Sequence, residues 1–557
     1  MSLLALSRCA TALLLLCTGA AWAAPDGALD PSFDGDGKQI IAFNIGGDAD
    51  GVLVNDDQLT AMVLAPGGRI YLAGILRRNG SSAIGLTRLR YDGKIDLAFG
   101  TQGRVVADLV DGQNNVLDAT LQQDGKLLVS GWVKAAGELY SSALVCRFLQ
   151  SGKLDTGFGD AQIPGCRVFA DPSNNRFFWG MLVQPDGRIV LAGHHTSIGL
   201  LLMRLAPDGS DDDTFGTGGT VLLDSQFIDS GFFSVARMAD GDLVAGGYTR
   251  LNPFDEEDVL LFRLDEQGVP DESFGPGGAK VITINAGTGP ERRLDAAARV
   301  HVTGDGFVYA TGLVSSDNNP DLDPSLSHTL LALKLGQNGE FDASFGGGVV
   351  LHDPCIIPCN SESWDSLLLP DGRLVLAGFH RDVTSNASEF FAMRLLAGGD
   401  PDPSFGEYSP GVASIDFAQV EAAESDDRAE RIALDGARVL LAGTATVPSI
   451  YPNQPPGTDF AITRLDHGVD ESFIVTPEFV PNANGTLSPS LSQEVPHSDH
   501  IEFTVFPAPG YRLDTITGCD GALYGNVYTT GAIVADCSIT ASFVLKPAAM
   551  FSDGFES

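Results

Sequence analysis

Apolar and polar residues follow each other along this chain in short runs separated by glycine-rich turns. Runs such as "GKQIIAF" (37–43) and "GRVVADL" (103–109) are too short for helices and carry the β-branched and alternating residues of strands. An Asp-Gly pair between two such runs, as in "QDGKLLVSG" (123–131), is typical of a tight hairpin, because glycine adopts positive φ angles at little cost. The pattern therefore predicts an all-β protein.

The turns belong to a repeat. Eight phenylalanines mark its copies: Phe33, Phe99, Phe158, Phe215, Phe274, Phe345, Phe405 and Phe473. An aspartate stands three residues before each: Asp30, Asp96, Asp155, Asp212, Asp271, Asp342, Asp402 and Asp470. The seven intervals between the phenylalanines are 57 to 71 residues long. Self-similarity at such a period indicates a repeat architecture.

Each interval contains two further landmarks. The first is a hairpin turn, in the segments 65–74, 123–131, 185–193, 239–247, 304–312, 370–378 and 434–443. The second is a cation inside an apolar strand: Arg88, Arg147, Arg204, Arg263, Lys334, Arg394 and Arg464. Each interval thus predicts four strands, of which one follows the phenylalanine, two flank the hairpin turn and the fourth carries the cation. Such a unit exposes apolar faces on both sides, so the copies must stack on each other.

Seven four-stranded units arranged radially predict a seven-bladed β-propeller over residues 24–473, which leaves only short, protected sheet edges. A parallel β-solenoid is the alternative, although solenoid coils are shorter than these intervals. Because a buried arginine needs a carboxylate partner, the recurrent cation and aspartate are expected to form one structural ion pair in each blade.

The repeat resembles a known family. Its pattern, "DGK/R-I/L-x-L-A-G … R-L … G-x-L-D-x-S-F-G-x-x-G", is similar to the bacterial delta-60 repeat over residues 29–473. The first copy departs from it with Gly67-Gly68 in place of Asp-Gly, and the fifth has Lys334 in place of arginine. The resemblance implies export and a propeller-like β structure, and it implies no particular chemistry.

Loop lengths divide the predicted propeller into two faces. The hairpin turn and the cation-to-phenylalanine connection have nearly constant length, whereas the loops between the first and second strands and between the third and fourth strands vary. In an antiparallel meander the two variable loops emerge on the same side. Insertions confined to one face often build a binding surface, so we expect ligand contacts there, and drift of unconstrained loops is the alternative reading. The candidate segments are 194–199, 248–258, 313–328 and 444–458.

The repeat ends after Phe473. Residues 474–545 alternate between apolar and polar positions and predict a small all-β domain, which Cys519 and Cys537 can staple. Within it, the run "PAPGYRLDTITGC … YTTGAI … DCSITASF" resembles an internalin-type bacterial β-repeat, which is often a module appended to exported proteins. Residues 546–557 are expected to form an unstructured tail.

The first 23 residues have the features of a secretory signal peptide. Arg8 precedes an apolar stretch over 10–21, and Ala21-Trp22-Ala23 provides a cleavage site. The stretch is too short for a membrane anchor, which needs about 20 apolar residues. Leu16 before Cys17 disfavours a lipoprotein. We expect a secreted, periplasmic or cell-surface protein without membrane insertion.

Charge and cysteine content narrow the class of partner. A formal net charge of −38 disfavours nucleic acid and anionic lipid as partners. Six cysteines remain after cleavage, and an even number in an exported chain predicts disulfides. Cys146 and Cys166 are expected to link neighbouring blades. We expect a monomer.

Few residues have the pattern of a chemical site. His352, Cys355 and Cys359 are zinc-ligand types, although a Cys355–Cys359 disulfide is the preferred interpretation. The remaining weak candidates are histidine pairs and acidic calcium loops: His194 with His195, His497 with His500, and the segments 34–37 and 317–323.

No residue is assigned as catalytic, cofactor-binding or metal-binding, because the nucleophile-elbow, zincin and phosphate-loop motifs are missing. The sequence favours a non-enzymatic binding or scaffold module for a protein or glycan. A hydrolase or lyase that acts on extracellular polymer near the propeller channel is the alternative, and a purely structural envelope protein is a third.

Overall fold

The computed structural model describes most of the chain. The described residues are 26–43, 56–78, 80–160, 162–197, 199–223, 228–250, 257–284, 294–315, 328–355, 359–382, 387–406, 411–417, 419–420, 425–449, 456–469, 471–479 and 484–546. Within these ranges the secondary structure consists of strands and two short 3₁₀ segments, Pro66–Gly68 and Pro276–Gly278. The predicted all-β class is confirmed. No helix in the described part of the chain is both long and apolar enough to cross a bilayer.

The first 28 strands form seven four-stranded antiparallel sheets in the described residues. Sheet 1 contains β2 (Asp57–Ala65), β3 (Arg69–Arg78), β4 (Ser81–Leu89) and β5 (Arg104–Ala107). Sheet 2 contains β6 (Gly112–Leu121), β7 (Leu127–Ala135), β8 (Ser142–Phe148) and β9 (Cys166–Phe169). Sheet 3 contains β10 (Arg176–Val183), β11 (Ile189–His195), β12 (Gly199–Leu205) and β13 (Thr220–Leu222). Sheet 4 contains β14 (Ile228–Arg237), β15 (Leu243–Arg250), β16 (Asp258–Leu264) and β17 (Ala279–Ile282).

The remaining three sheets complete the series. Sheet 5 contains β18 (Ala296–Val302), β19 (Val308–Ser315), β20 (His328–Leu335) and β21 (Val349–His352). Sheet 6 contains β22 (Cys359–Leu368), β23 (Leu374–Asp382), β24 (Ser388–Leu395) and β25 (Val412–Ile415). Sheet 7 contains β26 (Arg428–Asp435), β27 (Arg438–Val447), β28 (Gly457–Leu465) and, from the other end of the chain, β1 (Lys38–Ile41).

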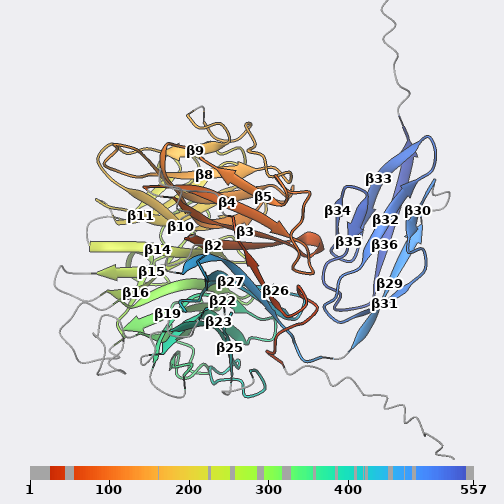
Figure 1. Cartoon of the computed structure of the whole chain (residues 1–557). Helices are drawn as coiled ribbons and strands as arrows, with labels where there is room; N and C mark the ends of the chain where they lie inside the picture. The colour runs from red at the N-terminus through yellow and green to blue at the C-terminus, as the bar shows by residue number, and fades with distance from the viewer. Residues whose placement is uncertain are drawn as a thin grey trace, which may run out of the picture.

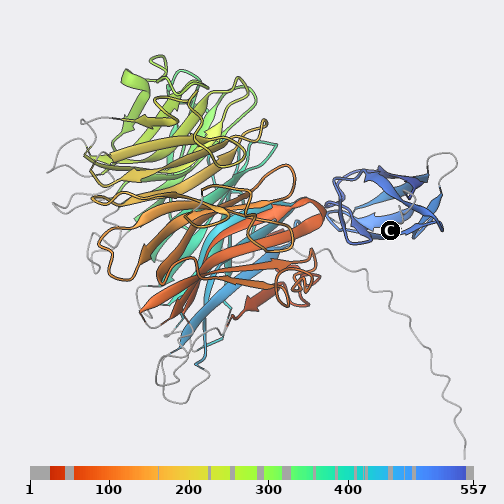
Figure 2. The ribbon, with the colours of Figure 1, turned by 90° about the horizontal axis from the view of Figure 1, so that it is seen from above.

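The sheets close into a ring. The first strand of each sheet contacts the first strand of the next, from β2 through β6, β10, β14, β18 and β22 to β26, and β26 contacts β2. The N-terminal strand β1 pairs with β28, from Lys38 opposite Thr463 to Ile41 opposite Phe460. Figures 1 and 2 show the orange strands of sheet 1 beside the blue strands of sheet 7. This closed arrangement is that of a β-propeller.

The sheets are out of phase with the predicted four-strand unit. The sequence predicts that the strand after each phenylalanine motif begins the next unit, but this strand pairs with the cation-bearing strand before it, as β5 pairs with β4. The connection between these two strands has nearly constant length, and it joins antiparallel neighbours in one sheet. The connection of variable length crosses from the outer strand of one sheet to the inner strand of the next.

Two consequences of this phase correct the sequence predictions. Cys146 and Cys166 form a disulfide, but they lie opposite each other on β8 and β9 and so join strands within one sheet instead of neighbouring blades. Phe473 does not mark an eighth copy. It lies in β29 (Ser472–Phe479) and packs against the core of the C-terminal domain.

The repeated phenylalanines form part of the cores between neighbouring sheets. Phe33 and the six markers from Phe99 to Phe405 each expose at most 2% of their surface. Burial of one phenylalanine side chain stabilises the fold by about 2–3 kcal/mol. Each sheet has two apolar faces, and each face is buried only when a neighbouring sheet covers it. The closed ring is therefore the stable unit.

The C-terminal segment forms a separate two-sheet domain (Figure 1). One sheet has the order β31 (Gln493–Pro496), β29, β36 (Cys537–Leu545), β33 (Tyr511–Thr517), with β29 and β36 parallel. The other has the order β30 (Gly485–Ser488), β32 (Glu502–Pro507), β35 (Val527–Thr529), β34 (Ala522–Tyr524). Val475, Phe503 and Tyr528 are buried between the sheets. The predicted Cys519–Cys537 disulfide is present.

Candidate functional site

The constant face holds the predicted ion pairs, and these serve structure. Each cation contacts the aspartate eight residues later at 2.7–3.1 Å, in the pairs Arg88–Asp96, Arg147–Asp155, Arg204–Asp212, Arg263–Asp271, Lys334–Asp342 and Arg394–Asp402. The seventh cation, Arg464, contacts Asp30 at 2.7 Å, so the last pair joins the two ends of the ring. The side-chain hydrogen bond from Lys334 lowers the pKa of Asp342 to about 2.

The arginines also fasten each sheet to the next. Arg88 donates from Nη1 to the carbonyl of Gln150 in sheet 2 at 2.7 Å, and Arg147 donates to the carbonyl of Pro207 in sheet 3 at 2.7 Å. The guanidinium of Arg88 lies 5.0 Å from the ring centroid of Phe99. The carboxylate, carbonyl and ring contacts occupy these arginines, so the constant face offers no array of free arginines at these positions.

The C-terminal domain covers the constant face where the ring closes, over sheets 1 and 7. The ring of Tyr524 lies under the Arg69 guanidinium at 4.4 Å, and its hydroxyl donates to the carbonyl of Pro66 at 3.0 Å. His500 contacts Asp435 at 3.0 Å, between Nε2 and Oδ1. Burial raises the pKa of Tyr524 to about 12.

This contact accounts for the departure of the first repeat copy from the Asp-Gly pattern. A Cβ atom on Gly68 would lie 2.4 Å from Cε1 of His500, and one on Gly67 would lie 3.0 Å from the carbonyl oxygen of Thr529. The glycine pair lets the C-terminal domain approach the turn closely.

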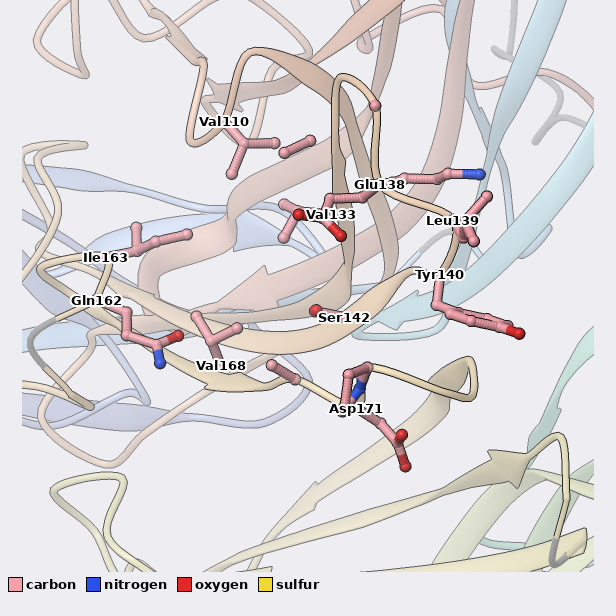
Figure 3. Close-up of a pocket in the computed structure, with 15 residues that line it drawn as sticks. Val110, Val133, Glu138, Leu139, Tyr140, Ser142, Gln162, Ile163, Val168 and Asp171 are labelled. Atoms are coloured by element: carbon pink, nitrogen blue, oxygen red, sulfur yellow. The ribbon is translucent and has the colours of Figure 1, made fainter.

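The variable loops share the opposite face. Arg78 at the end of β3 and Asp108 in the β5–β6 connection form an ion pair at 2.9 Å, so the two kinds of variable loop emerge together. On this face sheet 2 carries a pocket of about 610 Å³ (Figure 3). The β7–β8 loop supplies Leu139 and Tyr140, and the β9–β10 connection supplies Asp171.

The pocket combines an apolar wall with polar groups at its rim. Val110, Val133 and Val168 form the wall, and Ile163 lies at the end opposite Leu139 (Figure 3). Polar lining residues are Lys134, Glu138, Gln162 and Asp171. Hydrogen bonds from the backbone and hydroxyl of Ser173, together with one from His195, lower the pKa of Asp171 below its usual range. Such a mixture is typical of a ligand pocket.

Of the predicted variable segments, the structure describes only parts. Residues 251–256, 316–327 and 450–455 lie outside the described residues, and so does the calcium candidate 317–323. His194 and His195 do not form a metal pair. The Nδ1 atom of His194 contacts the carbonyl of Ser230 at 2.6 Å, whereas His195 contacts Asp171 at 3.1 Å.

The other candidate ligand sets are explained by structural contacts. Cys355 and Cys359 form a disulfide, and His352 contacts the carbonyl of Gly399 at 2.8 Å. The three candidate zinc ligands are therefore engaged in other contacts. His497 contacts His467 while His500 contacts Asp435. In the acidic loop 34–37, Asp36 accepts a hydrogen bond from the backbone of Lys38 at 3.0 Å, as in an ordinary turn.

The first strand of each sheet lines a central channel, which the sequence did not indicate. The register of each of these strands shifts where one extra residue forms a β-bulge, and β14 has a second shift between Ile228 and Gly231. The seven bulge residues all line one cavity of about 300 Å³: Thr60, Leu117, Trp179, Phe233, Ala298, Trp364 and Glu430. Arg299 and Arg431 complete the lining. The sequence contains a signal for these positions, because six of the seven bulge residues stand eight residues before the hairpin glycine of their repeat.

Comparison with known proteins supports the fold. A family model described as a domain of unknown function (DUF5122) β-propeller matches residues 122–158, 184–215 and 369–405. The fold is a β-propeller. The matched segments contain the hairpin turns and phenylalanine motifs of three repeat copies. No curated protein sequence matches the chain.

Several solved structures show weak similarity to this propeller. Virginiamycin B lyase from Staphylococcus aureus has a TM-score of 0.38 at 11% identity, over 76% of this chain and 99% of the other. The α-L-arabinofuranosidase Arb93A from Fusarium graminearum has a TM-score of 0.35 at 12% identity, over 69% and 98%. Sqt1 from Chaetomium thermophilum has a TM-score of 0.35 at 12% identity, over 74% and 97%. Similarities at this level carry no information about activity.

Proposed function

We propose that this chain is an exported binding module that holds a protein or glycan on the variable face of its propeller. The observation that carries the proposal is the pocket of about 610 Å³ on that face, in sheet 2. The predicted signal peptide over 1–23, the resemblances to the delta-60 and internalin-type repeats, and three disulfides support export, because disulfides persist in oxidising compartments.

The rim of this pocket favours a protein partner. Leu139 exposes 80% of its surface and Tyr140 exposes 38%, at the tip of the β7–β8 loop. Tyrosine is enriched among interface hot spots, and the exposed leucine beside it adds apolar surface that a protein partner can cover.

Capture experiments test this proposal. Purified mature chain is immobilised and exposed to an envelope and culture-supernatant extract of the producing organism, and separately to a glycan array. We expect specific capture that a Leu139→Ser/Tyr140→Ala double variant loses. Leu491→Ser is the matched control, since Leu491 exposes 76% of its surface in the C-terminal domain. Equal capture by the double variant, or no specific capture by the wild-type chain, would refute the proposal.

A hydrolytic site in the channel has weaker support. Glycosidases of the common type use two carboxylic acids that flank the scissile bond. Glu430 is the one carboxylic acid among the described residues that line the channel cavity. The neighbouring Asp118 and Asp365 each accept a backbone hydrogen bond from the next sheet, from Met181 at 2.9 Å and from Ile432 at 3.1 Å. These contacts support a structural role for both aspartates and favour binding over cleavage.

A further inference from the structure

Two tryptophans of this chain line the central channel. The sequence has four tryptophans, and Trp22 lies in the predicted signal peptide. The other three are Trp132, Trp179 and Trp364, from sheets 2, 3 and 6. They belong to a continuous series of ring contacts that includes Phe177 and Phe233.

The series runs from sheet 2 across to sheet 6. Ring centroids are separated by 6.0 Å between Trp132 and Phe177, and by 5.9 Å between Phe177 and Trp179. Phe233 then contacts Trp179 at 5.2 Å and Trp364 at 6.0 Å. All five side chains are only partly buried. Three of them, Trp179, Phe233 and Trp364, line the channel cavity and are open to a ligand there.

The fold does not require aromatic residues at these positions. Phe178 and Phe232, next to Trp179 and Phe233, have no exposed surface and fill the cores between sheets. The bulge residues point instead to the channel cavity, where other sheets carry Thr60 and Ala298. A small residue is thus sufficient for the bulge, so the large aromatic rings in sheets 3, 4 and 6 are left for another role.

Hydrogen-bonding groups lie beside the aromatic rings. Arg431 reaches from sheet 7 to the carbonyl of Leu117 in sheet 2, where Nη2 donates at 2.8 Å. Its Nε is buried without a hydrogen-bond partner among the described atoms. Arg299 is held by Asp365 at 2.6 Å, and Glu430 lines the same cavity. The cavity thus offers donors and an acceptor next to apolar ring faces.

A saccharide matches this combination of groups. A sugar ring has apolar C–H faces that pack on aromatic rings and hydroxyl groups at its edge that bond to charged side chains. A purely apolar ligand would leave Nε of Arg431 and the carboxyl group of Glu430 desolvated without hydrogen-bond partners, at a cost in free energy. An acidic ligand would gain little from the arginines, because Asp365 already balances the charge of Arg299 at 2.6 Å, and it would meet Glu430 in a protein whose formal net charge is −38. We propose that the central channel is a binding site for a neutral saccharide, formed by Trp179, Phe233 and Trp364 with Arg431 and Glu430.

This site is separate from the variable-face pocket, so each proposal can fail without the other. Intrinsic fluorescence reports on the channel, because two of the three tryptophans that remain after cleavage of the signal peptide, Trp179 and Trp364, line it. Mature chain is titrated with neutral hexasaccharides of glucose, galactose, mannose and xylose, and with oligosaccharides of galacturonic and glucuronic acid. We expect at least one neutral oligosaccharide to change the tryptophan emission in a saturable manner.

Variants identify the residues responsible. Trp179→Ala and Trp364→Ala are expected to weaken the affinity for that oligosaccharide at least tenfold, measured by calorimetry. Both variants are expected to fold, because Ala298 occupies the same position in sheet 5, and thermal unfolding checks this. Leu491→Ser, in the C-terminal domain, is the control and is expected to bind normally. Leu139→Ser tests whether the saccharide binds in the variable-face pocket instead.

Three results would overturn the proposal. The first is an emission that no neutral oligosaccharide changes at millimolar concentration. The second is a response to the acidic oligosaccharides alone. The third is an affinity that neither tryptophan variant reduces. A loss of affinity in Leu139→Ser alone would assign saccharide binding to the variable face and would equally exclude the channel.

Discussion

Removal of the Asp30 carboxylate is expected to weaken the propeller at the point where its two ends meet. Asp30 contacts Arg464 at 2.7 Å and Arg438 at 3.2 Å, and all three side chains are at least nine-tenths buried. It also accepts two hydrogen bonds from Ser32. Asp30→Ala leaves two buried guanidinium groups without this partner.

The size of the effect follows from what each arginine retains. Removal of one member of a buried ion pair costs about 3–5 kcal/mol. Arg464 keeps Asp435 at 3.4 Å, so we expect the lower end, about 3 kcal/mol. Asp271→Ala is the matched control. Asp271 is more exposed, and its partner Arg263 keeps Asp242 at 2.8 Å, so a loss of about 1 kcal/mol is expected.

Two measurements check this expectation. Urea unfolding gives the loss of stability for both variants. Trypsin cleavage after Lys38, in β1, reports whether the closing strand opens. We expect faster cleavage in Asp30→Ala than in the wild type, with no change in Asp271→Ala. Equal stability losses in the two variants, together with unchanged cleavage, would refute the reasoning that the closing pair carries more energy than an internal one.

Three further outcomes are expected. Gly68→Ala is expected to detach the C-terminal domain from the propeller, seen as an increased radius of gyration in solution scattering, whereas Gly277→Ala, at a similar φ of +62° but in open space, keeps the wild-type radius. The paired change Cys519→Ser/Cys537→Ser is expected to lower the stability of the C-terminal domain by about 3 kcal/mol, as measured by its thermal unfolding, because the disulfide closes a loop of 18 residues. Burial opposes ionisation of Asp402, but hydrogen bonds and the nearby arginine charge lower its pKa from 3.8 to about 2. The ionised carboxylate therefore stabilises the fold above pH 4, and this contribution is lost as the pH falls toward 2. Asp402→Asn is expected to flatten this part of the curve of unfolding free energy against pH.

The ion pairs could be predicted from the sequence. The cation and the aspartate of one pair, such as Arg204 and Asp212, are eight residues apart and joined by a connection of constant form. Their contact is therefore nearly local, and repetition made it visible. The division into constant and variable faces was predictable for the same reason, since it follows from strand order and loop length.

The channel and the interface between the domains were not predictable in this way. Trp179, Phe233 and Trp364 stand at the same position of three different repeats, eight residues before the hairpin glycine, but this spacing does not indicate which strand faces the channel or that their rings meet. The replacement of Asp-Gly by Gly67-Gly68 was visible, but its cause lies more than 400 residues away, at His500.

The sequence by itself determined the strands, the turns and the pairing of each cation with its aspartate, because these depend on contacts within a few tens of residues. Only the tertiary structure decided which sheet each outer strand joins, that β1 completes sheet 7, and which side chains face the channel. These features depend on ring closure, which brings residues from opposite ends of the chain together once the apolar faces of all the sheets are covered.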